Sequence, residues 1–161
     1  MGDKKLEYLL DVAIKNEEDA YNFYMDLHNK LADKEIKDTL KFLADEEKKH
    51  KEFLIKYKQG GFGAEALKLD AVIDYKIVEH AEKPDLQKNL DTKDVYLVAA
   101  DKELNSYRFY KSLADVEPAG EVKEMLLKMA NEEMKHKEKV EYLYSNTAFP
   151  QPFRRVLLLY R

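Results

Sequence analysis

The sequence predicts an all-α fold, a four-helix bundle built from a duplicated helix pair with a long crossover between the second and third helices. Glycine and proline are scarce, at five and four of 161 residues, as expected of a mostly helical chain. Apolar residues recur at spacings of three and four through four long segments, which is the period of an amphipathic helix. Residues 13–52 also match residues 99–138 without gaps at 16 of 40 positions, so the same helix pair occurs twice.

Four long helices are predicted, over residues 4–31, 34–58, 93–116 and 119–145. Short polar side chains accept hydrogen bonds from the free N–H groups at the start of a helix. Asp33 is therefore predicted to cap the second helix, and either Asp91 or Thr92 the third. Pro118 suits the first turn of the fourth helix. The glycine-rich residues 60–63 end the second helix, because glycine tolerates a left-handed backbone.

The connection between the two helix pairs covers residues 59–92, which is long enough to cross a bundle from one end to the other. A short helix is predicted within it, from residue 69 to residue 80, before Pro84 interrupts. The predicted domain organisation is one bundle over residues 1–145 and a C-terminal tail over residues 146–161. The tail carries an apolar run, and both packing on a partner subunit and disorder remain open for it.

Composition excludes several classes of function. The net charge of −4 with mixed signs provides no basic surface for nucleic acid. The absence of cysteine excludes disulfides, thiolate metal sites and a built-in rubredoxin-type or iron–sulfur centre. No apolar run approaches the ~20 residues that a membrane span needs, and the charged N-terminal segment is unlike a signal peptide. These features predict a soluble, cytoplasmic protein.

A Glu-x-x-His motif occurs twice on the apolar faces of predicted helices, 86 residues apart. Another glutamate lies 30 residues before each motif, in the middle of an otherwise apolar stripe. Residues three apart share one helix face, and antiparallel helices of equal length bring these levels together. We therefore predict that four carboxylates and two imidazoles meet in one interior. The predicted metal ligands are Glu17, Glu47, His50, Glu103, Glu133 and His136.

Burial of these carboxylates requires compensation, since even one unpaired buried ion costs several kcal/mol. Two divalent cations would neutralise four carboxylates. Oxygen and imidazole ligands without sulfur suit iron or manganese better than a structural zinc ion. A single Glu-x-x-His motif usually lies on a solvated helix face. Di-iron and di-manganese bundles, however, take their ligands from a glutamate on each of two helices and a Glu-x-x-His motif on each of the two others.

On these residues, together with Ala20, Tyr24 and Tyr110, residues 4–145 resemble the rubrerythrin branch of the ferritin-like superfamily. The resemblance implies a ferritin-like bundle with a non-haem centre of two iron ions, for which manganese or mixed metals are alternatives. It also implies reduction of hydrogen peroxide or, as in some members, oxidation of ferrous iron with oxygen. Tyr24 and Tyr110 are candidate hydrogen-bonding partners of the ligands, with simple core packing as the alternative.

The chain departs from the rubrerythrin pattern in two ways. It has no four-cysteine rubredoxin domain, so electrons would come from an external rubredoxin or reductase. Many members also carry an extra glutamate one turn from the third-helix ligand, where this chain has Ala100 and Ser106. No haem is expected, because Lys48 stands where bacterioferritins have their haem-ligating methionine.

Three hypotheses of function follow. The favoured one is a di-iron oxidoreductase that reduces peroxide, in which Glu47 and Glu133 bridge the metals, Glu17 and Glu103 are terminal ligands and each histidine binds one metal. The second is a ferroxidase or iron-handling protein, and the third a metal-free helical interaction module. A homodimer is expected, with neither nucleic acid nor a membrane as partner.

Overall fold

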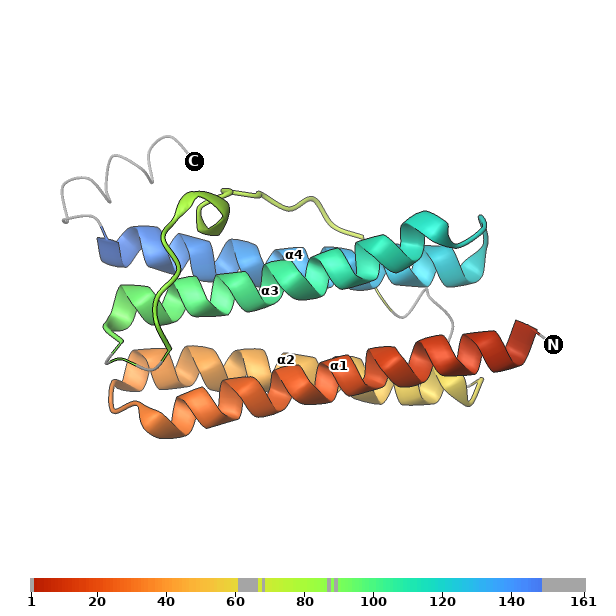
Figure 1. Cartoon of the computed structure of the whole chain (residues 1–161), viewed down its shortest axis with the longest axis horizontal. Coiled ribbons are helices and arrows are strands. Elements are labelled where there is room, and N and C mark those ends of the chain that lie inside the picture. The colour runs from red at the N-terminus through yellow and green to blue at the C-terminus, as the bar shows by residue number, and fades with distance from the viewer. Residues whose placement is uncertain (1, 61–66, 68, 87, 89, 149–161) are drawn as a thin grey trace. The chain divides into compact units, whose positions relative to one another are not determined.

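The computed structural model describes residues 2–60, 67, 69–86, 88 and 90–148 of the chain. These residues form four α-helices and one short 3₁₀ helix, with no strand among them, which confirms the all-α fold class and is consistent with a ferritin-like four-helix bundle. Figure 1 shows the elements in order. They are α1 (Gly2–Lys30), α2 (Lys34–Lys58), η2 (Val78–His80), α3 (Thr92–Val116) and α4 (Glu121–Ala148).

The chain divides into two compact units. The first unit comprises residues 1–68 and 117–125, and so contains α1, α2 and the first residues of α4. The second unit comprises residues 69–116 and 126–161, with η2, α3 and the rest of α4. Each unit thus carries one copy of the duplicated ligand pattern. The prediction of a single bundle domain over residues 1–145 stays a prediction.

In the first unit, α1 and α2 pack side by side as a helical hairpin (Figure 1). The predicted cap is confirmed, because the Ile36 N–H donates to Asp33 Oδ1 at 3.0 Å. α2 ends where the sequence predicts, with Gly60 at a φ of +80° just past the helix. The apolar stripes of both helices are buried, including Leu10, Ala13, Ala20, Leu40, Leu43, Ala44 and Leu54.

In the second unit, Asp91 rather than Thr92 caps α3. The Asp94 N–H donates to Asp91 Oδ1 at 3.0 Å, and the Asp91 N–H donates back to Asp94 Oδ2 at 3.4 Å. This reciprocal pair satisfies two N–H groups that the helix itself leaves free. The following turns of α3, residues 95–100, are buried on every side, and η2 packs against this helix.

The helix predicted over residues 69–80 is wrong except for its last turn. Only Val78–His80 is helical, and the preceding described residues have no regular structure. The reason is tertiary: side chains of α4 accept the hydrogen bonds of several backbone N–H groups here, which a local helix would otherwise satisfy. The segment also turns at Lys76, whose φ of +52° lies in the left-handed region that side chains disfavour.

The predicted start of the fourth helix is also corrected. Pro118 lies before α4 and not in its first turn. The Gly120 carbonyl, on a residue with a φ of +151°, accepts a hydrogen bond from the Glu124 N–H at 3.0 Å, so α4 begins only after this glycine. At its other end α4 continues to Ala148, beyond the predicted end. Gly61–Gly63 and residues 149–161 of the predicted tail lie outside the described residues. No helix among the described residues is long and apolar enough to cross a membrane.

Candidate metal centre

The first unit brings Glu17 of α1 together with Glu47 and His50 of α2. All three are buried, with exposed fractions of 0%, 1% and 6%. His50 Nδ1 lies 3.7 Å from Glu17 Oε2 and 4.0 Å from Glu47 Oε2. One oxygen or ring nitrogen from each of the three residues lies within 4.8 Å of the other two. We call these three residues the first half-site.

The second unit repeats this arrangement with Glu103 of α3 and with Glu133 and His136 of α4, the second half-site. Their exposed fractions are 1%, 0% and 4%. His136 Nδ1 lies 3.4 Å from Glu103 Oε2. Again one ligand atom from each residue lies within 4.8 Å of the other two. The glutamate and histidine of the motif point to one spot because three residues make up most of a helical turn.

The chemistry of each half-site fits a divalent metal ion. Two carboxylates and one imidazole offer hard and borderline donors, which iron, manganese and similar cations accept. Burial of a carboxylate pair without a cation is unfavourable, because removing each charge from water costs several kcal/mol. The structure therefore buries all six predicted ligands, and each half-site belongs to a group of side chains that could hold a metal ion. Their individual roles as ligands stay predictions.

Tyr24 and Tyr110 are fully buried in their units. Each packs edge-to-face against the phenylalanine before it, with ring centroids 5.6 Å apart for Phe23–Tyr24 and 5.0 Å for Phe109–Tyr110. Such pairs add about 0.5–1.5 kcal/mol beyond burial alone. Both rings are thus held in the same geometry in the two repeats. A hydrogen bond from either hydroxyl to a ligand stays a prediction.

The neighbouring glutamates behave as surface charges. Glu46 and Glu132 are partly exposed, and each pairs with the lysine three residues later, at 3.0 Å to Lys49 and 3.1 Å to Lys135. His28 contacts the Asn29 side chain on the surface. Glu132 differs from Glu46 in one respect, because one of its oxygens also lies within 4.8 Å of a ring nitrogen of His136, in a group that could hold a metal ion.

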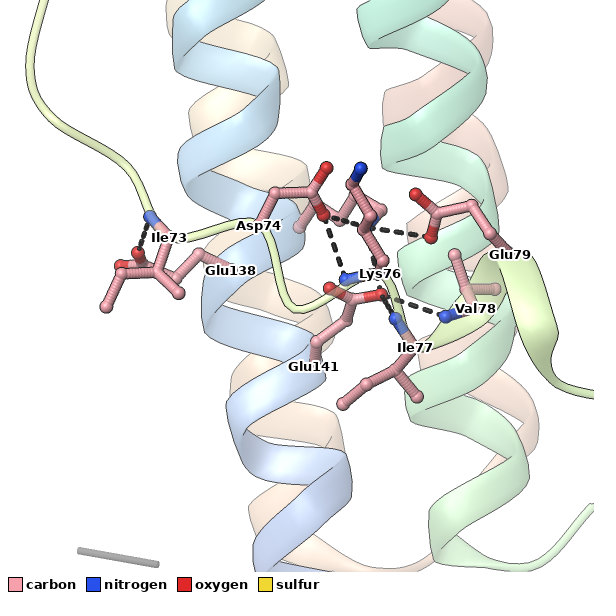
Figure 2. Close-up of polar contacts among 9 residues, drawn as sticks. Ile73, Asp74, Lys76, Ile77, Val78, Glu79, Glu138 and Glu141 are labelled. Carbon is pink, nitrogen blue, oxygen red and sulfur yellow. Dashed lines mark hydrogen bonds and ion pairs between the residues drawn. The ribbon is translucent and has the colours of Figure 1, made fainter. Parts of the chain in front are cut away.

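A buried ionic cluster in the second unit, centred on Lys137, was not predicted from the sequence. Figure 2 shows its three carboxylates, on Asp74, Glu79 and Glu141. The Lys137 and Glu141 side chains are both 0% exposed. Lys137 Nζ lies 2.7 Å from Asp74 Oδ1, 2.9 Å from Glu141 Oε2 and 3.0 Å from Glu79 Oε1. Burial alone would lower the pKa of Lys137, but hydrogen bonds to the three carboxylates outweigh it and raise this pKa. The one signal in the sequence is the spacing of four between Lys137 and Glu141.

The cluster makes the second unit sensitive to acid through Asp74. Partial burial raises the pKa of Asp74, but hydrogen bonds from Lys137 Nζ and the Lys76 N–H outweigh it and lower the pKa below 3.8. Because the folded pKa is depressed, Asp74 stabilises the fold above pH 3.8, and this contribution is lost as the pH falls through the folded pKa. We expect the free energy of unfolding, measured with urea, to fall less between pH 5 and pH 3 in Asp74→Asn than in the unchanged protein. An equal loss in both would contradict this role.

The fold and the two half-sites define an all-α protein with buried carboxylate–imidazole groups that could hold metal. The model of the Rubrerythrin family matches residues 8–144, and the chain belongs to this family, whose members bind a di-iron centre. The comparisons with curated proteins and with solved structures gave no significant match.

Proposed function

We propose that the protein is a non-haem di-iron oxidoreductase that reduces hydrogen peroxide with electrons from an external donor. The observation that carries this proposal is the buried Glu, Glu and His set, which occurs once in each unit of a rubrerythrin family member. Reduction of one peroxide to two waters takes two electrons and two protons. Two ferrous ions, when bound, supply those two electrons at a fixed separation.

In this proposal Glu17, Glu47 and His50 would hold metal in the first half-site, and Glu103, Glu133 and His136 would hold it in the second. The four carboxylates balance the charge of two divalent ions. Several residues one turn from the ligands are buried and apolar, among them Ala13, Ala20, Leu43 and Ala44. Charge interactions in such surroundings are stronger than they would be in water.

The buried tyrosines are proposed to hold protons near the ligands. Tyr24 and Tyr110 lie seven residues after Glu17 and Glu103, on the same helix faces. A phenol hydroxyl at that position would donate a hydrogen bond to a carboxylate and fix its orientation. Their rings are already locked by the edge-to-face contacts with Phe23 and Phe109.

Turnover in this proposal needs a second protein. The chain has no cysteine with which to build an iron–sulfur or rubredoxin-type donor. Electrons would therefore come from a separate rubredoxin or reductase. We propose that the protein acts as a homodimer, without nucleic acid or a membrane as partner.

The test is anaerobic loading with ferrous iron, followed by separate mixing with peroxide and with oxygen. We expect stoichiometric oxidation that is faster with peroxide, and poor turnover until a reductant protein is added. Stopped-flow absorbance of the ferric product measures both rates. Glu133→Ala should abolish the reaction, and Tyr110→Phe should change the rate without changing metal content. Glu124→Ala, at an exposed glutamate of the same helix, is the matched control. Unchanged kinetics in Glu133→Ala would disprove the assignment of the centre.

A ferroxidase or iron-handling role is the second candidate. It is favoured by the third-helix positions next to Glu103, where Ala100 and Ser106 are buried and neither can add a carboxylate ligand. The extra glutamate of many peroxide-reducing family members therefore has no counterpart at these positions. Oxidation by oxygen clearly faster than by peroxide, together with a large cage on size-exclusion chromatography, would establish this role instead.

A further inference from the structure

The two half-sites have the same ligands but different supports. Lys51 follows His50 in the first repeat, as Lys137 follows His136 in the second. Lys51 pairs with Glu18 at 3.1 Å, and both side chains are about one-third or more exposed, at 34% and 43%. Lys137 is fully buried and contacts three carboxylates. Both repeats therefore have a lysine at this position, but only the lysine of the second repeat is buried among carboxylates.

In the second unit, residues 70–79 of the crossover form hydrogen bonds and ion pairs with side chains of α4. We call these contacts the crossover clamp. Asn131 exchanges two hydrogen bonds of 3.0 Å with the backbone of Asp70. Glu138 accepts a hydrogen bond from the Ile73 N–H (Figure 2). Glu141 Oε2 accepts from the N–H groups of Ile77 and Val78, both at 2.9 Å.

The clamp brackets the motif on α4. Its contacts begin at Asn131, two residues before Glu133, and end at Glu141, five residues after His136. The stretch of helix that carries both ligands is therefore held at each end. Glu79 and Asp74 add ionic contacts to Lys137, the residue next to His136.

The first repeat lacks the residues that build this clamp. Ile55 stands where α4 has Glu141, so it offers no carboxylate to a backbone N–H. Asp45 stands where α4 has Asn131, and its carboxylate pairs with Lys41 of its own helix. Glu52, the counterpart of Glu138, is exposed on α2.

We propose that the crossover clamp preorganises the second half-site, so that the chain binds metal in a fixed order, first at His136 and then at His50. This inference rests on the proposed dimetal function and adds a loading sequence to it. Ligands that are already fixed lose less conformational freedom when an ion binds, so their affinity is higher. The first half-site has the same donors, but the counterparts of the clamp residues on α2 make none of the clamp contacts described above.

The order can be measured by adding Co²⁺ to the metal-free full-length protein and following its visible absorbance. The unchanged protein should bind two ions in separable steps. His136→Ala should lose the tight step, and His50→Ala the weak one. Two steps of equal affinity, or loss of the tight step in His50→Ala, would overturn the proposed order. Absence of Co²⁺ binding would overturn the dimetal function as well, whereas ordered binding without any reaction with peroxide would overturn that function alone.

The contribution of the clamp is tested by Asp74→Asn combined with Glu79→Gln. These changes remove two carboxylates on the crossover and leave Lys137 paired with Glu141. Asp74 and Glu79 contact Lys137 and not a metal ligand. We therefore expect the affinity of the tight step to fall by up to about tenfold, the least that loss of a direct partner of a ligand causes, with the affinity of the weak step unchanged. Asn131→Ala, which breaks the clamp without changing charge, should act in the same direction.

The matched control is Glu18→Gln, which removes the partner of Lys51 in the first repeat. The dissociation constant of the tight step should stay within twofold of that of the unchanged protein, because the second half-site does not depend on that pair. Equal weakening of both steps by the clamp variants, or weakening of the tight step by Glu18→Gln to the same extent, would overturn the role of the clamp.

Discussion

Lys137→Met is expected to lower the free energy of unfolding of the metal-free protein by about 3–5 kcal/mol, the range for removing one partner of a buried ion pair. The ammonium is fully buried and is the shared partner of Asp74, Glu79 and Glu141. Without it, Glu141 remains fully buried and loses the cation that it shares with Asp74 and Glu79. Urea unfolding followed by circular dichroism at neutral pH measures the loss.

Lys51→Met is the matched control, since the duplication places the two lysines at equivalent positions. The pair between Lys51 and Glu18 is partly exposed, and solvent screening limits its contribution to about 1 kcal/mol or less. Similar small losses in both variants would mean that the Lys137 cluster contributes no more than a surface pair. A large loss in Lys51→Met would argue instead for a general requirement for this lysine.

The helices could be predicted where their ends carry local signals. α2 has the predicted bounds because the Asp33 side chain accepts from its first turn and Gly60 supplies the left-handed residue after its last. α3 is likewise marked by Asp91. α4 begins later than predicted. Its first backbone hydrogen bond is accepted by the Gly120 carbonyl, so Pro118, which suggested an earlier start, lies outside the helix.

The ligand candidates could be singled out because the duplication aligns them. A lone glutamate on an apolar stripe is ambiguous, but Glu17 and Glu103 occupy the same position in both repeats, as do the two motifs. The structure buries each of them, and within each unit the two glutamates and the histidine lie close together, while their roles as ligands stay predictions. The pairing of chain segments within each unit follows from the apolar stripes that they share.

The crossover and its cluster could not be predicted, because the partners are distant in sequence. The Val78 N–H and its acceptor on Glu141 are 63 residues apart, and the Asp70 N–H and Asn131 are 61 residues apart. Nothing local shows that these N–H groups have acceptors outside the segment, so the sequence pattern favours a helix, whose own carbonyls would satisfy them. Lys137 shows the same limit: its burial depends on carboxylates from the crossover, which periodicity along α4 cannot reveal.

Removal of metal is expected to lower the melting temperature substantially near neutral pH. A ligand that binds only the folded chain stabilises it by about 2.7 kcal/mol at 100 times its dissociation constant and about 4.1 kcal/mol at 1,000 times. Loss of the ions would also leave the carboxylates of each half-site buried beside one another without a cation. The loaded protein should contain two ions per chain by metal analysis, and scanning calorimetry should show it melting well above the metal-free protein.

The difference between the two melting temperatures should shrink as the pH falls. Metal binding requires deprotonated carboxylates and neutral imidazoles, so protons compete with the ion for Glu17, Glu47 and His50 and for their counterparts in the second unit. Protonation also relieves the repulsion in the metal-free protein.

Glu47→Gln combined with Glu133→Gln is the informative variant, because it removes two of the proposed ligand charges at nearly constant shape. Its metal-free form should melt higher than that of the unchanged protein and gain little from added metal. Equal melting temperatures for loaded and metal-free protein at pH 7 would show that these buried carboxylates are stabilised by some means other than a bound cation.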